Sequence, residues 1–184
     1  MAVRKARTRF PDISILLVDG EKQDDLPLVN EGIEVLDIII GVIIEIKNYI
    51  SRRLDPNDAS FNIEIGAKLM RAQRDLLRQA AYLFINYPQQ QDVMAIAATG
   101  PYWTYAILER VHVNHLMNVL RKEDKDYNLN FKVGDRKPEW KKHFILGVSG
   151  SNRMLHRIHR LLKEKAEVGA KRLTGVDILP PGRG

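Results

Sequence analysis

The chain has 184 residues, of which 45% are hydrophobic and 28% charged. We therefore expect one folded domain rather than a disordered chain or a coiled coil. There is no cysteine, which excludes disulfides, thiolate nucleophiles, iron–sulfur clusters and Cys-ligated zinc. The 29 Lys+Arg exceed the 23 Asp+Glu and give a formal net charge of +6, which favours an anionic partner such as nucleic acid.

Residues 1–10 form a basic N-terminal segment. No apolar stretch long enough for a signal peptide follows it. The most apolar run, residues 38–46, is about half the length of a membrane span and carries Glu45. We therefore expect an intracellular protein without a membrane span. The basic segment is compatible with a nuclear signal, a DNA-contacting arm or a solvated tail.

Two β-rich regions come first along the chain. Residues 12–18 are rich in β-branched side chains and leucine, and the Asp-Gly pair directly after them predicts a turn. A polar loop is expected over 21–32. The run 33–47 is almost continuously apolar. Gly41 within it indicates two strands, or a helical turn followed by a strand at 42–47.

The middle of the chain predicts a long helix and a hairpin. Apolar residues recur every three or four positions from about 62 to 87, as an amphipathic helix requires, and a proline follows. Residues 93–98 are expected to form a strand and 99–101 a turn. The aromatic-rich residues 102–109 are expected to return as the second strand of the hairpin.

The last third is more polar. Residues 121–142 predict a surface loop, and 143–148 a further strand. The sequence Ser-Gly-Ser-Asn at 149–152 is typical of helix capping and precedes a basic helix that we expect to end near Val168. The order of elements predicts an α/β (α+β) single domain with a mixed central sheet flanked by helices.

Three ionisable residues occupy positions in or beside apolar strands, where a strand with a purely structural role is not expected to carry charge. Glu45 and Lys47 lie two positions apart in an apolar strand, so both side chains project from one face. Burying a carboxylate and an ammonium there is costly unless they are paired, hydrated or coordinated. Asp12 reaches the same region if the two strands are neighbours. An edge strand with a solvent-facing salt pair is the structural alternative.

Carboxylates at adjacent strand ends make a hard oxygen site that suits Mg²⁺ or Mn²⁺. Such a metal lowers the pKa of a bound water and stabilises charge on a phosphodiester. A neighbouring lysine positions that water or stabilises the developing charge. The pattern of Asp12, Glu45 and Lys47 is therefore compatible with metal-dependent hydrolysis.

The sequence Pro11-Asp12, an apolar strand and then Glu45-Ile46-Lys47 resembles the signature of the PD-(D/E)XK (restriction-endonuclease-like) nuclease superfamily. The long helix and the strand after it also suit that superfamily's core order. The run "YP…DVMAIAATGPYW" resembles uncharacterised fungal nuclease-like domains, some of which belong to secreted-effector architectures. The resemblance covers about residues 10–110, and it implies a nuclease-like domain over 11–170 with a tail over 171–184.

By this resemblance, Asp12 and Glu45 are expected to be metal ligands together with the main-chain carbonyl of Ile46, and Lys47 the catalytic lysine. Many members place a glutamine or tyrosine near the site on the following helix, where Gln73 and Gln79 are the candidates. The superfamily usually has a helix before the first strand. Only ten residues precede Pro11 here, so this helix is expected to be absent or to lie in a missing N-terminal part.

The C-terminal helix carries a run of basic residues that is expected to contact backbone phosphate. A solvated surface is the alternative interpretation. His156 and His159 lie three apart on this helix, but no third metal ligand follows at a defined spacing. The residues expected to contact phosphate are Arg153, Arg157, Arg160 and Lys163.

Together these features predict a nuclease that hydrolyses phosphodiester bonds with Mg²⁺ or Mn²⁺, with DNA as the expected substrate. The rival is a catalytically inactive nuclease-like module that binds nucleic acid or protein, within a larger effector protein. The lack of a first helix favours the module, whereas the intact Asp–Glu–Lys set favours the enzyme. A purely structural domain predicts neither metal binding nor salt-sensitive DNA binding.

Overall fold

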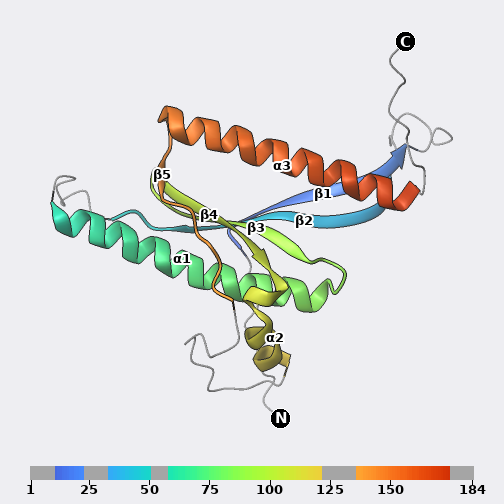
Figure 1. The fold of residues 1–184 in the computed structure, drawn as a ribbon, viewed down its shortest axis with the longest axis horizontal. Helices are drawn as coiled ribbons and strands as arrows, with labels where there is room; N and C mark the ends of the chain where they lie inside the picture. Colours follow the sequence, from blue (N-terminus) through green and yellow to red (C-terminus); the bar gives the residue numbers. More distant parts are fainter. Residues whose placement is uncertain (1–10, 23–32, 51–57, 122–135, 175–184) are drawn as a thin grey trace.

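The computed structural model describes residues 11–22, 33–50, 58–121 and 136–174. It shows a five-stranded mixed sheet in the order β1-β2-β3-β4-β5, with α1 against one face and α3 against the other (Figure 1). The α/β fold with a mixed sheet flanked by helices is thereby confirmed. Within these residues no helix combines the length and the apolar character that a bilayer crossing needs.

The first two strands, β1 (Ile13–Lys22) and β2 (Ile33–Lys47), form a long antiparallel pair. The expected turn at Asp19-Gly20 is wrong, because β1 continues through these two residues. The pairing register shifts between them because Leu36 of β2 is an extra, unpaired residue at this point, so β1 passes through the Asp-Gly pair opposite a β-bulge instead of reversing. Of the loop expected over 21–32, residues 23–32 lie outside the described part of the chain.

Gly41 does not interrupt β2, and the expected break there is wrong. The register between β1 and β2 skips Gly41, which is the extra residue of a second bulge. A Cβ atom at this position would lie 3.0 Å from Cγ of Leu17 and 3.4 Å from Cδ2 of Leu162. Gly41 therefore allows the first strand and the C-terminal helix to approach the backbone of β2 closely.

Helix α1 (Ala59–Asn86) joins β2 to the parallel strand β3 (Asp92–Thr99). It begins three residues before the expected start at 62, because the Asp58 side chain accepts a hydrogen bond of 2.9 Å from the Ser60 N–H and caps the first turn. The expectation of one long amphipathic helix that ends near residue 87 is confirmed. The β2-α1-β3 unit lays α1 across one face of the sheet (Figure 1).

Strand β4 (Tyr102–Glu109) returns antiparallel to β3 through a turn at Gly100, whose φ is +55°. This hairpin is confirmed: β4 has the expected bounds, and β3 is one residue longer at each end than the expected 93–98. A 3-10 turn η2 (Arg110–His112) and a short helix α2 (Asn114–Arg121) follow. Strand β5 (Phe144–Ile145) pairs with the start of β4, and has only two of the six residues expected over 143–148. Most of the expected loop over 121–142 lies outside the described residues.

Helix α3 (Ser149–Thr174) begins earlier and ends later than expected. The residues expected to cap it are part of its first turn. Ser151 is buried, and its Oγ accepts a hydrogen bond of 3.0 Å from Nε1 of Trp103. The serine therefore fastens the helix to β4, which sequence-local reasoning did not predict.

The core has two layers, one on each side of the sheet. The layer under α1 joins alternate residues of β2, β3 and β4 to the helix, with Ile43, Leu76 and Phe84 among its members. The layer under α3 contains Val42 and Ile158. Trp103 and Tyr105 also belong to the second layer and are buried.

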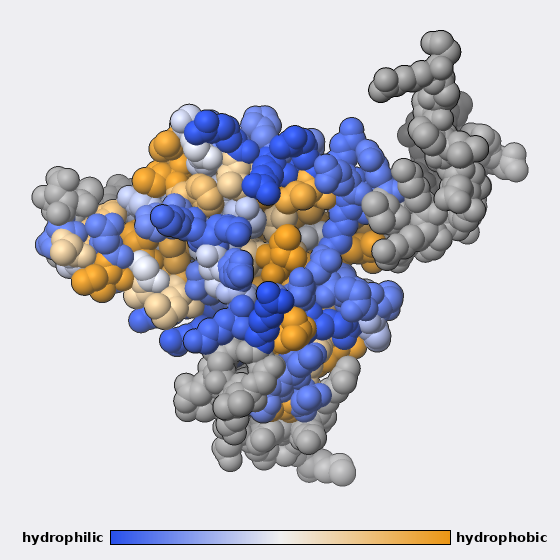
Figure 2. Space-filling view, in the orientation of Figure 1, coloured by the Kyte–Doolittle hydropathy of each residue, from blue (hydrophilic) through white to orange (hydrophobic). Residues whose placement is uncertain are grey.

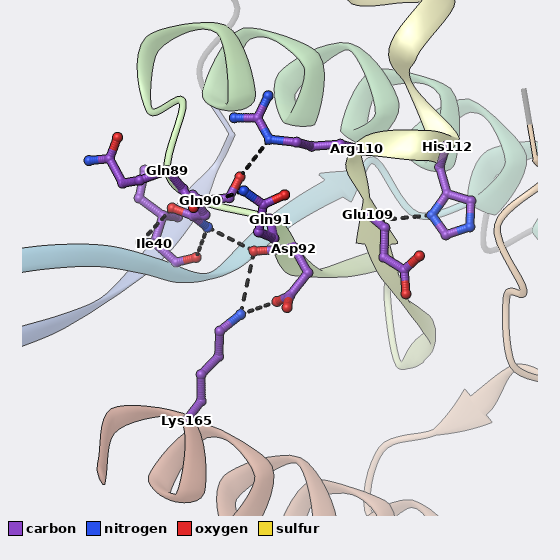
Figure 3. Close-up of polar contacts among 9 residues, drawn as sticks. All are labelled: Ile40, Gln89, Gln90, Gln91, Asp92, Glu109, Arg110, His112 and Lys165. Atoms are coloured by element: carbon purple, nitrogen blue, oxygen red, sulfur yellow. Dashed lines mark hydrogen bonds and ion pairs between the residues drawn. The ribbon is translucent and has the colours of Figure 1, made fainter. Parts of the chain in front are cut away.

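Polar side chains join the end of α1 to the sheet (Figure 3). Arg110 donates four hydrogen bonds of 2.6 to 3.0 Å to the carbonyls of Phe84, Tyr87, Pro88 and Gln90. Its guanidinium thereby satisfies carbonyls that the end of a helix leaves without intrahelical partners. Gln90 is buried and bonds to both the N–H and the carbonyl of Ile40, which links the turn after α1 to the middle of β2.

We expect Arg110→Met to lower the free energy of unfolding by about 2–3 kcal/mol, because it removes charge-assisted hydrogen bonds at the end of α1 while keeping much of the side-chain volume. Urea unfolding followed by circular dichroism measures this change. Arg74→Met, at an exposed position of the same helix, is the control and is expected to change stability by less than about 0.5 kcal/mol.

A substitution of Gly41 tests the close approach at the bulge, and Gly66 of α1 serves as the comparison position. We expect Gly41→Val to lower the free energy of unfolding by about 1–3 kcal/mol, because its side chain overpacks the contact with Leu17 and Leu162. Gly66→Ala is expected to raise it by about 0.5–1 kcal/mol, because a Cβ at this exposed helical position has no neighbour within 4 Å. Equal stability of Gly41→Val and the wild type in urea would contradict the close approach at Gly41.

Candidate functional site

Strand β2 projects Glu45 and Lys47 toward α1. Ile43, on the same face, belongs to the core layer under α1, whereas Ile44 packs with the layer under α3. Ile46 is exposed. The expectation that Glu45 and Lys47 share one face is therefore confirmed. Glu45 is only 8% exposed, so its carboxylate is removed from solvent and depends on protein partners.

The ammonium of Lys47 lies between two carboxylates. Its Nζ is 2.6 Å from Oε1 of Glu45 and 2.6 Å from Oδ2 of Asp75. Asp75 belongs to α1, so the pair of contacts joins the helix to β2. Sequence reasoning missed Asp75, although it stands four positions before Gln79 and hence on the same side of the helix. That spacing was the available signal.

Gln79 is brought to the site as expected. Its Nε2 donates a hydrogen bond of 2.7 Å to Oε2 of Glu45, and the side chain is buried. The amide thus orients the second oxygen of the carboxylate whose first oxygen bonds Lys47. Gln73 is not brought there, because it is two positions from Asp75 and projects from nearly the opposite side of α1.

Asp12 lies at the start of β1, beside the end of β2. The register pairs Ile13 with Ile44, and continuing it by one residue places Asp12 opposite Glu45. The exposed Asp12 side chain accepts a hydrogen bond of 2.6 Å from the main-chain N–H of Ile46 through Oδ2. The expected proximity of Asp12 to the strand of Glu45 and Lys47 is confirmed, and the carboxylate extends the ladder by one bond.

The surroundings of Lys47 determine its charge state. Burial acts to lower the pKa of Lys47, but the hydrogen bonds and the negative charges of Asp75 and Glu45 outweigh it, so the pKa is raised above the ordinary lysine value. Lys47 is therefore an ammonium at neutral pH. It can donate hydrogen bonds and stabilise negative charge, but it cannot accept a proton from water.

The oxygen atoms at this strand end match the ligand type that Mg²⁺ or Mn²⁺ takes. No group of three or more His, Cys, Asp or Glu side chains suited to a metal occurs among the described residues. Mg²⁺ commonly retains several waters and is held through only one or two carboxylates. A site of that kind would need only Asp12 and Glu45 as its carboxylates, with the carbonyl of Ile46 as a further ligand.

The basic residues of α3 lie on the other side of the sheet from this cluster (Figure 1). Their side chains are exposed, and the outer surface of α3 is largely hydrophilic (Figure 2). His156 and His159 are exposed on the same helix. The structure thus separates the site at the end of β2 from the four basic residues that were expected to contact phosphate, namely Arg153, Arg157, Arg160 and Lys163.

Comparisons of the chain with protein-family models, with curated proteins and with solved structures find no match.

The raised pKa of Lys47 predicts how stability changes with pH. A group whose pKa is raised on folding contributes stability that is fully present below its unfolded pKa, about 10.4 for lysine, and that is lost as pH rises through the folded pKa. We expect Lys47→Met to cost about 1–3 kcal/mol at pH 7, because it leaves two partly buried carboxylates without their cation. This cost is expected to shrink above about pH 10.5.

Urea unfolding of the wild type and Lys47→Met at pH 7, 9 and 11 measures this difference. Lys68→Met is the control, because Lys68 makes no ion pair with any residue that the structure describes. Its difference from the wild type is expected to stay within about 0.5 kcal/mol at every pH. A cost of Lys47→Met that grows on going to pH 11 would contradict the assigned direction.

Proposed function

We propose that the chain is a metal-dependent phosphodiesterase acting on nucleic acid, with DNA as the expected substrate, through a site of the PD-(D/E)XK type. The observation that supports this proposal most is the convergence of Asp12, Glu45 and Lys47 at the paired ends of β1 and β2. A buried carboxylate beside a half-buried ammonium on an otherwise apolar strand is costly, and such arrangements cluster at functional sites.

Each residue then has a chemical role. Asp12, Glu45 and the carbonyl of Ile46 would hold Mg²⁺ or Mn²⁺. The bound metal lowers the pKa of a water and stabilises charge on a phosphodiester. Lys47, as an ammonium, stabilises the negative charge that develops on the phosphoryl oxygens. It does not serve as the base, because its pKa is raised by Asp75 and Glu45.

Two residues of α1 support these groups. Asp75 holds the Lys47 ammonium at 2.6 Å, and Gln79 holds the second oxygen of Glu45 at 2.7 Å. The order β1-β2-α1-β3, with β3 parallel to β2, agrees with the order of elements expected from the resemblance. Both features support a nuclease-like arrangement, and the order of elements does so independently of the short sequence motif.

One observation favours a second candidate, a nuclease-like module that binds nucleic acid or protein without hydrolysis. Both oxygens of Glu45 are already bonded, one to Lys47 and one to Gln79. A network in which these groups satisfy one another can join α1 to the sheet without any metal. The two candidates differ in whether Asp12 and Glu45 bind a divalent ion.

The test is a nicking assay on supercoiled plasmid with Mn²⁺ or Mg²⁺. We expect metal-dependent nicking by the wild type and a loss of about 100-fold or more in Asp12→Asn and Glu45→Gln. Asp12→Asn keeps a side-chain oxygen for the Ile46 N–H and removes only the charge, so folding is expected to be preserved. Manganese titration of each variant by calorimetry reports ligand loss separately from chemistry.

Lys165→Met is a matched control for Lys47→Met. Lys165 forms an ion pair with Asp92 that joins α3 to β3, on the opposite face of the sheet. Lys47→Met is expected to abolish nicking, whereas Lys165→Met is expected to stay within about threefold of the wild type. Full nicking by a folded Asp12→Asn would exclude this site. Nucleic-acid binding without manganese binding or nicking would favour the non-hydrolytic module.

A further inference from the structure

A pocket of about 330 Å³ lies beside β4, on the face of the sheet that α3 covers. Its apolar wall comes from Tyr105, Ile107 and Leu161. The site at the end of β2 is on the other face, against α1. The pocket is therefore separate from the cluster of Glu45 and Lys47.

Hydrogen bonds hold the walls of the pocket in place. The segment 136–143 runs along β4, where the Lys141 N–H donates to the Tyr105 carbonyl at 3.0 Å and the Lys141 carbonyl accepts from the Thr104 hydroxyl at 2.5 Å. Helix α3 is fastened above by the bond of Ser151 to Trp103 and by the contact of Tyr105 Oη with Sδ of Met154 at 3.1 Å. These bonds therefore fix the backbone of both segments that carry the cationic side chains.

Three cations from these two walls line the pocket: Arg136 and Lys141 from the segment, and Arg157 from α3. Two carboxylates, Glu109 and Glu139, are also in the lining. Among the residues that the structure describes, none of the three cations forms an ion pair with a carboxylate. The three cations exceed the two carboxylates, so the lining has a net formal charge of +1 and a positive potential that favours an anion.

Further basic residues surround the opening. Lys137 and Lys142 directly follow the lining residues Arg136 and Lys141. Arg153 and Arg160 lie one turn before and one turn after Arg157 on α3. All four side chains are exposed. The positive surface is therefore longer than the pocket, as a site for a chain of phosphates requires and a site for one isolated anion does not.

We infer that this pocket is an anchoring site for the backbone phosphates of a nucleic acid, with Arg136, Lys141 and Arg157 as its central contacts. The choice of nucleic acid as the source of the phosphate rests on the proposed function. The phosphate chemistry rests on the pocket and its cations alone. Arg136 and Lys141 extend the basic surface beyond the residues of α3 that the sequence indicated.

The test is fluorescence anisotropy with a labelled 30-nucleotide DNA, single-stranded and duplex, in EDTA so that no hydrolysis occurs. The triple variant R136Q/K141Q/R157Q is compared with K68Q/R71Q/R74Q on α1, which removes the same number of charges from the other side of the sheet. We expect the first to weaken binding about 10-fold or more and to lower the salt slope by about 2–3. The second is expected to stay within about threefold of the wild type.

Equal losses in the two triple variants would overturn the inference, because net charge alone would then explain binding. Absence of DNA binding by the wild type would overturn it as well. Pyrophosphate binding that the R136Q/K141Q/R157Q substitutions abolish, without DNA binding, would overturn nucleic acid as the source. Because EDTA removes divalent ions, these outcomes are distinct from failure of hydrolysis, which the nicking assay of Asp12→Asn measures.

Discussion

A carboxylate in the interior between a sheet and a helix must be compensated by nearby donors, and the arrangement at the end of β2 follows from this constraint. Glu45 is 8% exposed and bonds Lys47 through one oxygen and Gln79 through the other. Lys47 in turn requires Asp75, which binds its ammonium from α1. Compensation of one buried charge thereby links the long helix to the sheet through Asp75 and Gln79, whether or not the site holds a metal.

The alternation of β2 divides the molecule into two chemical surfaces. Ile43, Glu45 and Lys47 project toward α1, whereas Val42 and Ile44 project toward α3. The acidic and lysine cluster therefore belongs to one face and the basic pocket to the other. A polyanion that contacts both has to pass around the edge or the end of the sheet, so binding and chemistry can be tested separately.

Buried polar groups fix how the elements are placed, and most of them act between elements distant in the chain. Gln90 bonds the backbone of Ile40, and the Trp103 indole donates to Ser151. Arg110 binds the carbonyls at the end of α1. Each of these groups would be costly to bury without its partner, so the alternatives in which the helices slide along the sheet are disfavoured.

Local patterns in the sequence determined the features that depend on neighbouring residues. The period of two in β2 placed Glu45 and Lys47 on one face, and the period of 3.6 gave most of α1 (Ala59–Asn86). The turn at Gly100 followed from its own residues. The charge excess favoured an anionic partner, and the absence of cysteine excluded thiolate nucleophiles and Cys-ligated metals, without any structural information.

Features that depend on contacts between distant segments were decided only by the tertiary structure. Gly41 is typical of a strand break by itself, and becomes a bulge because Leu17 and Leu162 approach it. Ser151 is typical of a cap, and instead bonds Trp103. In the sequence Asp75 is an ordinary helix residue, and only the packing of α1 against β2 places it beside Lys47. A residue's own neighbours predict the direction of its side chain, but the group it meets there is set by the folding of the whole chain.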